Sequence, residues 1–328
     1  MKISVLESGS WGTALACAVA RNGHEVTLHS LHTHRSALLR ETRENPRLPG
    51  VILPENLLFA DGLTGVETAD AVLVVTPSIA VRETAKNLRG LVRDDAIVIS
   101  AAKGIERGTS LRMTQVIAEE IGGEERIAVL SGPSHAEEVA GGIPTGCVVA
   151  SVSENTAMQV QNMVTSNLFR IYTTSDVVGV ELCGALKNII AMCSGICMGL
   201  GFGDNSNAMM MTRGLNEMAN LCAALGGRKE TTAGLAGVGD LFVTCTSRHS
   251  RNRSAGLYIG QGMSAAEANE KVGAIVEGYY ATSAAQWTFY NLYTCSFVRF
   301  ANEIFQQIIC FQNHLLSFYI HNLALIFF

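Results

Sequence analysis

The sequence of 328 residues lacks any run rich in lysine and arginine. Its 24 basic residues are outnumbered by 29 acidic ones, which gives a formal net charge of −5. Proteins that bind nucleic acid usually concentrate basic side chains on one surface. We therefore expect no nucleic-acid partner.

Nine cysteines are present, but they form no CxxC pair and no regular framework. Several of them, such as Cys193 and Cys197, lie inside apolar runs, which is typical of buried thiols rather than of disulfides or a metal site. The N-terminus enters a strand-like run at residues 2–6 and lacks the apolar segment and cleavage site of a secretory signal. These absences predict a cytoplasmic protein without a bound metal.

Charge is nearly missing from the end of the chain, where Arg299 and Glu303 are the only formally charged side chains after Trp287. Neither the helical nor the strand period is clean there. The last 25 residues are long enough to span a membrane, but polar side chains interrupt them repeatedly. We expect no stable membrane insertion, and we expect residues 286–328 to be atypical and poorly ordered.

The first half of the chain has the pattern of alternating strands and helices. Residues 2–6, 13–22 and 25–28 read as a strand, an Ala-rich helix and a second strand around a Gly-containing turn. Residues 71–75, 96–99 and 127–130 are apolar runs typical of strands buried on both faces. The pattern predicts an α/β fold with a doubly wound, mostly parallel Rossmann-type sheet.

Small polar residues follow three of these strands, at residues 76–78, 100–104 and 131–134. Doubly wound sheets bind ligands at the carboxyl ends of their strands. Lys103 lies in the second of these segments and is a candidate ligand-binding cation. A solvated loop lysine is the competing interpretation.

Strand patterns give way to helical ones at about Val178, so we place a boundary between residues 1–178 and an all-helical second domain at 179–328. The first helix of that domain, residues 180–200, is apolar except for Lys187, the only lysine or arginine between Arg170 and Arg213. A lysine here could extend to the surface. Its small neighbours at helical spacing instead suggest room for a ligand, and a desolvated amine has a lowered pKa suited to proton transfer. These neighbours are Gly184, Ala191 and Ser194.

Two further segments of the helical half carry chemistry. Asp240 lies between glycines and an apolar run, which predicts a buried position. Because a buried acid is usually paired with a cation, we propose Lys187 as its partner. The alternative is that Asp240 is the N-cap of a helix. Ser250, Arg251, Asn252 and Arg253 gather a hydroxyl, an amide and two guanidiniums, which can bind a phosphate. A solvated polar loop is the alternative for this cluster.

Eight segments follow one another in this order: GSWGTALA at 9–16, LPGVILPENL at 48–57, SAAKGIE at 100–106, LSGPSHAEEVA at 130–140, ELCGALKNIIA at 181–191, GLAGVGDLFVTCTS at 234–247, HSRNR at 249–253 and VEGYYA at 276–281. Together they resemble the bacterial NAD(P)-dependent glycerol-3-phosphate dehydrogenases over about residues 1–285. The Gly-rich turn alone would be weak support, because many dehydrogenases share it.

The resemblance implies reversible hydride transfer between sn-glycerol 3-phosphate and NAD or NADP, with NADP the favoured coenzyme, giving dihydroxyacetone phosphate and supplying phospholipid synthesis. It implies a small phosphorylated substrate as partner, and it leaves a homodimer open. Lys187 would transfer the proton, with Asp240 and Lys103 beside it. The substrate residues it implies are Lys103, Gly132, Ser134, Lys187, Asp240, Ser250, Arg251 and Asn252, and the cofactor residues are Gly9, Ser10, Trp11, Gly12, Lys103, Ala136, Arg251 and Glu277.

The chain departs from this family in three places. Glu7 replaces the first glycine of the turn, where we expect backbone strain and repulsion of the coenzyme diphosphate. Residues 29–32 after the second strand supply neither an acid nor an arginine for the ribose. The end after Ala285 loses the family pattern, as an altered reading frame would cause. A cofactor-binding pseudoenzyme and a related two-domain hydroxyacid dehydrogenase therefore remain alternatives.

Overall fold

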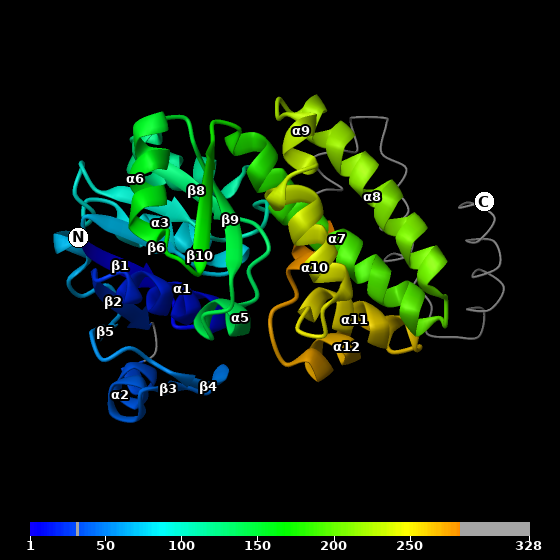
Figure 1. Ribbon diagram of the computed structural model, residues 1–328, viewed down its shortest axis with the longest axis horizontal. Coiled ribbons are helices and arrows are strands. Elements are labelled where there is room, and N and C mark those ends of the chain that lie inside the picture. The colour runs from blue at the N-terminus through cyan, green and yellow to red at the C-terminus, as the bar shows by residue number, and fades with distance from the viewer. Residues whose placement is uncertain (31–32, 283–328) are drawn as a thin grey trace.

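A computed structural model describes residues 1–30 and 33–282. Figure 1 shows two parts side by side, a sheet covered by helices and a bundle of helices that follows it in the chain. The expected character of residues 286–328 lies outside the described residues. The arrangement confirms the predicted α/β fold with a helical second half.

The strands are β1 Lys2–Leu6, β2 Glu25–Ser30, β3 Glu44–Asn45, β4 Leu48–Ile52, β5 Leu57–Asp61, β6 Ala71–Val74, β7 Ile97–Ser100, β8 Ile127–Ser131, β9 Thr145–Ser151 and β10 Phe169–Thr174. The helices are α1 Ser10–Arg21, α2 Thr33–Thr42, α3 Val81–Leu88, α4 Met113–Ile121, α5 Ala136–Ala140, α6 Glu154–Val164, α7 Val177–Gly199, α8 Asp204–Ala224, α9 Lys229–Thr232, α10 Asp240–Thr246, α11 Arg251–Gly260 and α12 Ala265–Val272.

Eight strands form one sheet in the order β10-β9-β8-β7-β6-β1-β2-β5. All neighbours pair in parallel except β8 and β9, so the last two strands run against the others. Strand side chains alternate between two cores: Leu73 packs with α1 and α6 on one face, whereas Val72 and Val74 pack with α3 and α4 on the other. Burial on both faces explains why these strands are apolar throughout.

The five strands expected from the sequence are present, each within two residues of its predicted bounds. The two antiparallel additions, β9 and β10, were not predicted. They extend the sheet on the side next to the helical half, where Val148 and Ala150 of β9 contribute to the apolar surface that packs against α7.

The helix α7 joins the two parts of the molecule. Its apolar side chains share one core cluster with Ile105, Val129 and Ala150 from the sheet part. Of the described helices, α7 alone is long and apolar enough to cross a membrane, but it is 94% buried inside the protein over that length. The last strand ends at Thr174 and α7 begins at Val177, while the domain boundary at residue 178 stays a prediction.

Candidate functional site

A buried carboxylate joins two lysines at the seam between the two parts. Lys187, in the middle of α7, donates to Asp240 Oδ1 at 2.5 Å and to Thr244 Oγ1 at 2.8 Å. Asp240 is the first residue of α10 and follows a π-helix at Leu235–Gly239, a distortion frequently found at functional sites. The pairing predicted for Lys187 and Asp240 is present, and Gly239 rather than Asp240 occupies the N-cap position.

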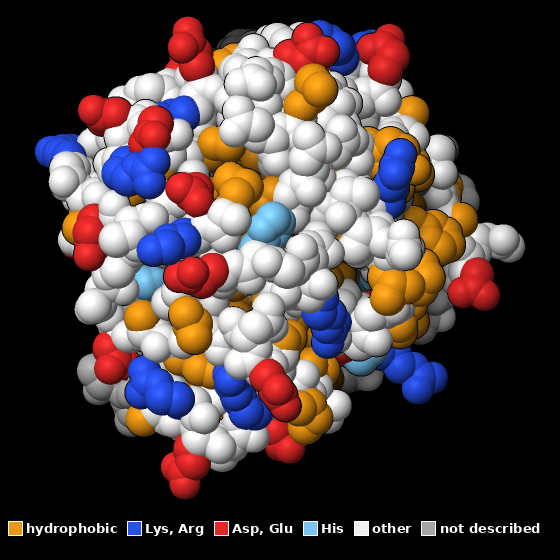
Figure 2. All heavy atoms as spheres, turned by 60° about the vertical axis from the view of Figure 1, so that its left-hand side comes forward, with side chains coloured by type: hydrophobic (Ala, Val, Ile, Leu, Met, Phe, Trp, Pro, Cys, Tyr) orange, Lys and Arg blue, Asp and Glu red, His pale blue; other side chains and the backbone are white. Residues whose placement is uncertain are grey.

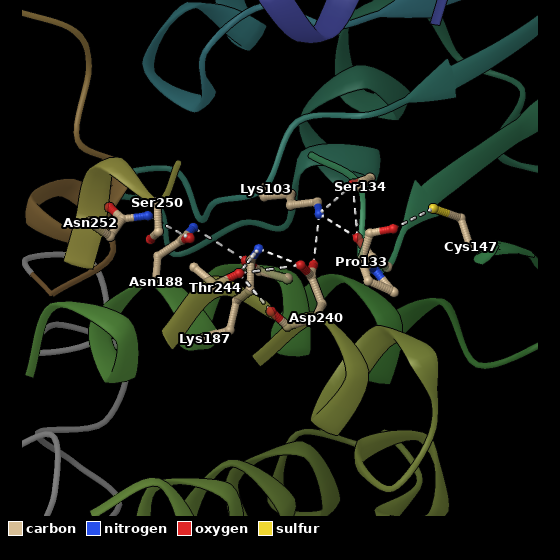
Figure 3. A network of polar contacts seen from close by, with 12 residues as sticks. Lys103, Pro133, Ser134, Cys147, Lys187, Asn188, Asp240, Thr244, Ser250 and Asn252 are labelled. Carbon is tan, nitrogen blue, oxygen red and sulfur yellow. Dashed lines mark hydrogen bonds and ion pairs between the residues drawn. The ribbon is translucent and has the colours of Figure 1, made fainter. Parts of the chain in front are cut away.

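The second lysine reaches the same carboxylate from the loop after β7. Lys103 Nζ donates to Asp240 Oδ2 at 2.6 Å, to the Gly132 carbonyl at 2.9 Å and to Ser134 Oγ at 3.2 Å. Figure 3 shows the two ammonium groups on either side of Asp240. All three Nζ hydrogens of Lys103 are thereby engaged, whereas among the residues that the structure describes Lys187 donates to Asp240 and Thr244 only. One hydrogen of Lys187 is left for a ligand.

Burial and charge together shift the pKa values of Asp240 and Lys187. Burial opposes ionisation of Asp240, but Lys103 and Lys187 overcome it and hold the pKa of Asp240 below its usual value. Burial lowers the pKa of Lys187 to about 8, although the charge of Asp240 acts in the opposite direction. An amine with a pKa near the working pH can both accept and donate a proton.

The small neighbours of Lys187 have a different use from the one predicted. A Cβ on Gly184 would lie 2.9 Å from Ser131 Oγ and 3.5 Å from Lys103 Cγ, so the space at Gly184 is taken by Ser131, with Lys103 beside it, rather than by a ligand. Ser194 is fully buried and donates to Asn207 Oδ1. These small residues allow neighbouring elements to pack closely on α7.

The start of α11 brings the predicted phosphate cluster to α7. Ser250 is the N-cap of α11 and accepts from the Arg253 N–H at 3.2 Å. Asn252 donates to Asn188 Oδ1 of α7 at 2.8 Å and accepts from the Gly278 N–H at 2.8 Å. Both side chains therefore hold the local structure, and their predicted contact with substrate stays a prediction.

The two arginines of this cluster lie in different surroundings. Arg251 stands exposed at the first position of α11, within electrostatic range of Glu277. Arg253 is half-buried and donates to Met198 Sδ at the end of α7. Of these two described arginines, Arg253 hydrogen-bonds to α7, whereas Arg251 forms no hydrogen bond with that helix. Glu277, the neighbour of Arg251, accepts hydrogen bonds from the N–H and the hydroxyl of Ser78, which follows the carboxyl end of β6.

The turn between β1 and α1 fits a dinucleotide. Gly9 has open space where a side chain would stand, and α1 begins at Ser10 without a side-chain cap, so its first N–H groups can receive a diphosphate. A Cβ on Gly12 would lie 2.0 Å from the Glu7 carbonyl oxygen, which explains that glycine. Trp11 Nε1 is buried and has no hydrogen-bond partner among residues 1–30 and 33–282.

Glu7 has a φ of +89°, in the region that favours glycine, which confirms the expected strain. Its side chain forms an ion pair with Arg35 of α2, in which Nη1 and Oε1 are 3.4 Å apart. This partner was not predicted. Repulsion between Glu7 and a diphosphate stays a prediction.

The segment after β8 completes the seam. Gly132 has a φ of +135°, in the region that favours glycine. The Ser134 hydroxyl donates a hydrogen bond to the Gly132 carbonyl, and the buried Ala136 is the first residue of α5. His135 was missed by the sequence analysis. Its Nε2 is buried and has no hydrogen-bond partner in the described part of the chain, and its ring lies 5.8 Å from that of His249, just before Ser250. His135 could have been identified from the sequence, because it lies between Ser134 and Ala136, which were both predicted to bind ligands.

The remaining expectations concern charge, metal and thiols. Figure 2 shows acidic and basic side chains intermingled on the outer face of the sheet part. Within residues 1–30 and 33–282, no group of three or more His, Cys, Asp or Glu side chains is placed to hold a metal ion. The seven cysteines in these ranges carry free thiols, and burial raises the pKa of Cys147 to about 12.

Two family models match the chain. One, described as the N-terminus of NAD-dependent glycerol-3-phosphate dehydrogenase, matches residues 2–157. The other, described as the C-terminus of the same enzyme, matches residues 176–311. The second match continues beyond Ala285, where the sequence pattern of the family was expected to end.

Individual relatives agree with these matches. The chain is 48% identical over 285 residues to a glycerol-3-phosphate dehydrogenase [NAD(P)+] of Desulfitobacterium hafniense (strain Y51), covering 87% of this chain and 81% of that protein. A protein of the same name from Moorella thermoacetica is 49% identical over 286 residues, with 87% and 85% covered. The crystal structure of glycerol-3-phosphate dehydrogenase from Coxiella burnetii superposes with a TM-score of 0.88 at 35% identity, covering 94% of this chain and 97% of that one.

Proposed function

The chain belongs to the NAD-dependent glycerol-3-phosphate dehydrogenase family, and we propose that it interconverts sn-glycerol 3-phosphate and dihydroxyacetone phosphate with NAD(P). The triad of Lys103, Asp240 and Lys187 at the seam supports the proton-transfer chemistry of the proposal, and the family match supports its substrate. Hydroxyacid dehydrogenases of the same two-domain plan are the rival class. The triad itself does not separate the two classes, whereas the family match does.

In this proposal Lys187 moves the proton. During oxidation its neutral amine takes the proton of the C2 hydroxyl, and during reduction its ammonium returns a proton to the C2 oxygen. The coenzyme, when bound, accepts or supplies the hydride. Lys187 suits this role because one of its hydrogens is uncommitted and because burial lowers its pKa to about 8.

Lys103 and Asp240 position Lys187 and balance its charge. With two ammonium groups on one carboxylate, the triad keeps one net positive charge when Lys187 is protonated. That charge would stabilise negative charge on the C2 oxygen. Arg251, exposed at the head of α11, would bind the substrate phosphate, with Ser250 and Asn252 holding that helix end in place.

The coenzyme would lie over the β1–α1 turn, held at its diphosphate by the N-terminus of α1 and at its other end near Ser78 and Glu277. We favour NADP over NAD. A small phosphorylated substrate, a homodimer, a cytoplasmic location and a role in supplying phospholipid synthesis complete the proposal.

The test is NADH and NADPH oxidation with dihydroxyacetone phosphate, run beside unphosphorylated dihydroxyacetone and 2-oxo acids. We expect turnover of the phosphorylated ketone only. Lys187→Ala should lower kcat by about 10²–10⁴ and leave coenzyme binding nearly unchanged. Lys86→Ala, which removes an exposed lysine of α3, is the matched control and should keep the wild-type rate.

A Lys187→Ala enzyme that retains more than about a tenth of the wild-type rate would show that the proton passes elsewhere. Preference for a 2-oxo acid would favour the hydroxyacid dehydrogenase alternative. Nucleotide binding without turnover of any of these substrates would identify a pseudoenzyme.

A further inference from the structure

We propose that Arg35 binds the 2′-phosphate of NADP and that Glu7 competes with this phosphate for the same guanidinium. The inference rests on the proposed dinucleotide site and concerns residues for which the family resemblance gives no role. The two side chains form an ion pair between the end of one strand and the helix that follows its neighbour.

The topology brings the pair to the coenzyme side of the sheet. Glu7 directly follows β1, and Arg35 is the third residue of α2, which follows β2. The two strands are parallel neighbours, and the Glu7 N–H donates to the His29 carbonyl of β2 at 3.2 Å. Arg35 Nη1 lies 3.4 Å from Glu7 Oε1, and both side chains are mostly covered, with 18% and 16% of their surface exposed.

This position is where doubly wound folds read the adenosine ribose. An acid after the second strand accepts a hydrogen bond from the 2′-hydroxyl of NAD, whereas an arginine there accommodates the 2′-phosphate of NADP. Arg35 is the first charged residue of either sign after β2 in this sequence. An acid is present as well, but Glu7 supplies it from the end of the neighbouring strand.

The pair is weak enough to exchange for a ligand. At 3.4 Å through one nitrogen, it is longer than a well-formed charge-assisted hydrogen bond of about 2.7–2.9 Å. A phosphate offers the guanidinium two parallel hydrogen bonds and more charge than a carboxylate. Binding of NADP would therefore replace Glu7 on Arg35, while NAD would leave the ion pair intact. Glu7 thus lowers the preference for NADP that Arg35 creates.

The test is calorimetric titration with 2′,5′-ADP, 5′-AMP, NADP⁺ and NAD⁺. Arg35→Ala should weaken 2′,5′-ADP and NADP⁺ by at least about tenfold and leave 5′-AMP and NAD⁺ within about twofold. Arg21→Ala is the matched control, because Arg21 is exposed at the opposite end of α1. Thermal unfolding of each variant checks that the fold is kept.

Glu7→Gln retains the side-chain shape and the backbone conformation while removing the charge. It should tighten NADP⁺ several-fold without tightening NAD⁺, and the gain should vanish when Arg35→Ala is also present. Equal losses for all four ligands in Arg35→Ala would overturn the inference, as would equal gains for both coenzymes in Glu7→Gln. A wild-type protein that binds none of the four would refute the proposed function and this inference with it.

Discussion

Asp240 has a role that neither lysine could provide alone. Each of its two carboxylate oxygens accepts from a different ammonium group, one from the sheet part and one from the helical part. A buried carboxylate with two cationic partners remains ionised, and it keeps two buried like charges close to each other. The residue thus sets the charge of the site and raises the pKa of Lys187 against the effect of burial.

This dependence gives a prediction for the pH profile. Because the pKa of Lys187 is lowered to about 8, ketone reduction, which needs the ammonium, should fall as pH rises through about 8. Alcohol oxidation, which needs the amine, should rise over the same range. Asp240→Asn removes the charge that raises this pKa, so both midpoints should move to lower pH. Initial rates measured from pH 6 to 10 in both directions provide the check.

Stability should respond to the same group with a definite sign. The folded pKa of Lys187 is below its ordinary value of 10.5, so between about pH 8 and 10.5 the unfolded chain binds more protons. The contribution of Lys187 to stability therefore increases as pH rises through that window.

The rate profiles have their own contradicting outcome. If the pH midpoints of ketone reduction and alcohol oxidation stay in place in Asp240→Asn, the proposed coupling between Asp240 and Lys187 is wrong.

At this scale the sequence allowed the partners to be predicted but not their geometry. Lys187 and Asp240 were identifiable because each is an isolated charge in an apolar segment. The engagement of all three Lys103 donors depends on where two distant loops meet, which no local pattern encodes. Thr244 accepts from Lys187 and was missed because a threonine in a helix gives no signal by itself.

The crossing of α7 and α11 is the element that places the phosphate cluster beside Lys187. The two helices approach through glycines: a Cβ on Gly195 would lie 2.0 Å from the Arg253 carbonyl oxygen, and one on Gly256 would lie 2.0 Å from the Met192 carbonyl oxygen. Small residues at such contacts allow helix backbones to come close together. The Asn188–Asn252 hydrogen bond depends on this proximity.

Gly256→Ala should therefore force the helices apart. Overpacking against a fixed backbone carbonyl should destabilise the fold by at least about 1–3 kcal/mol and should raise KM for the phosphorylated substrate more than for the coenzyme. Gly203→Ala, at a glycine with open space around it, is the control and should cost about 1 kcal/mol or less. Urea unfolding and substrate kinetics measure both effects. A stability equal to that of the control would mean that α11 moves freely on α7.

The strands differ in how far sequence could predict them. Strands β6, β7 and β8 lie in continuous apolar runs, which identify them. In β10, buried Phe169 and Ile171 alternate with exposed Arg170 and Tyr172 over only six residues. Such a short segment becomes a strand because β9 is available as its partner. The antiparallel pairing of β9 with β8 in turn depends on tertiary contacts rather than on the local sequence. The added strands were therefore beyond local inference.

At the scale of the whole molecule, the two parts share one core and one site. The core cluster around α7 includes Val129 and Ala150 of the sheet, and ion pairs and hydrogen bonds cross the seam at Lys103–Asp240 and Ser78–Glu277. Neither part could separate without exposing apolar surface and leaving buried charges unpaired. The fold assignment of each half could be predicted, whereas this dependence between them could not.

We expect the two parts to unfold in a single transition. Two tryptophans are present, so a Trp287→Phe variant leaves Trp11 of α1 as a fluorescent probe of the sheet part. Its thermal transition should coincide with that of far-ultraviolet circular dichroism, which is dominated by helices throughout the protein. Separate midpoints would show that the sheet part and the helical part are independent folding units.

The contact between α7 and α11 also has a consequence for evolution. At Gly195 and Gly256 the atom that excludes a side chain is a backbone carbonyl of the opposite helix, which every amino acid carries. No substitution in one helix can therefore compensate for a larger residue in the other. Each glycine is constrained independently of its partner, so relatives should keep both without correlated changes. Comparing sequences for covarying pairs would then miss one of the tightest contacts in the molecule.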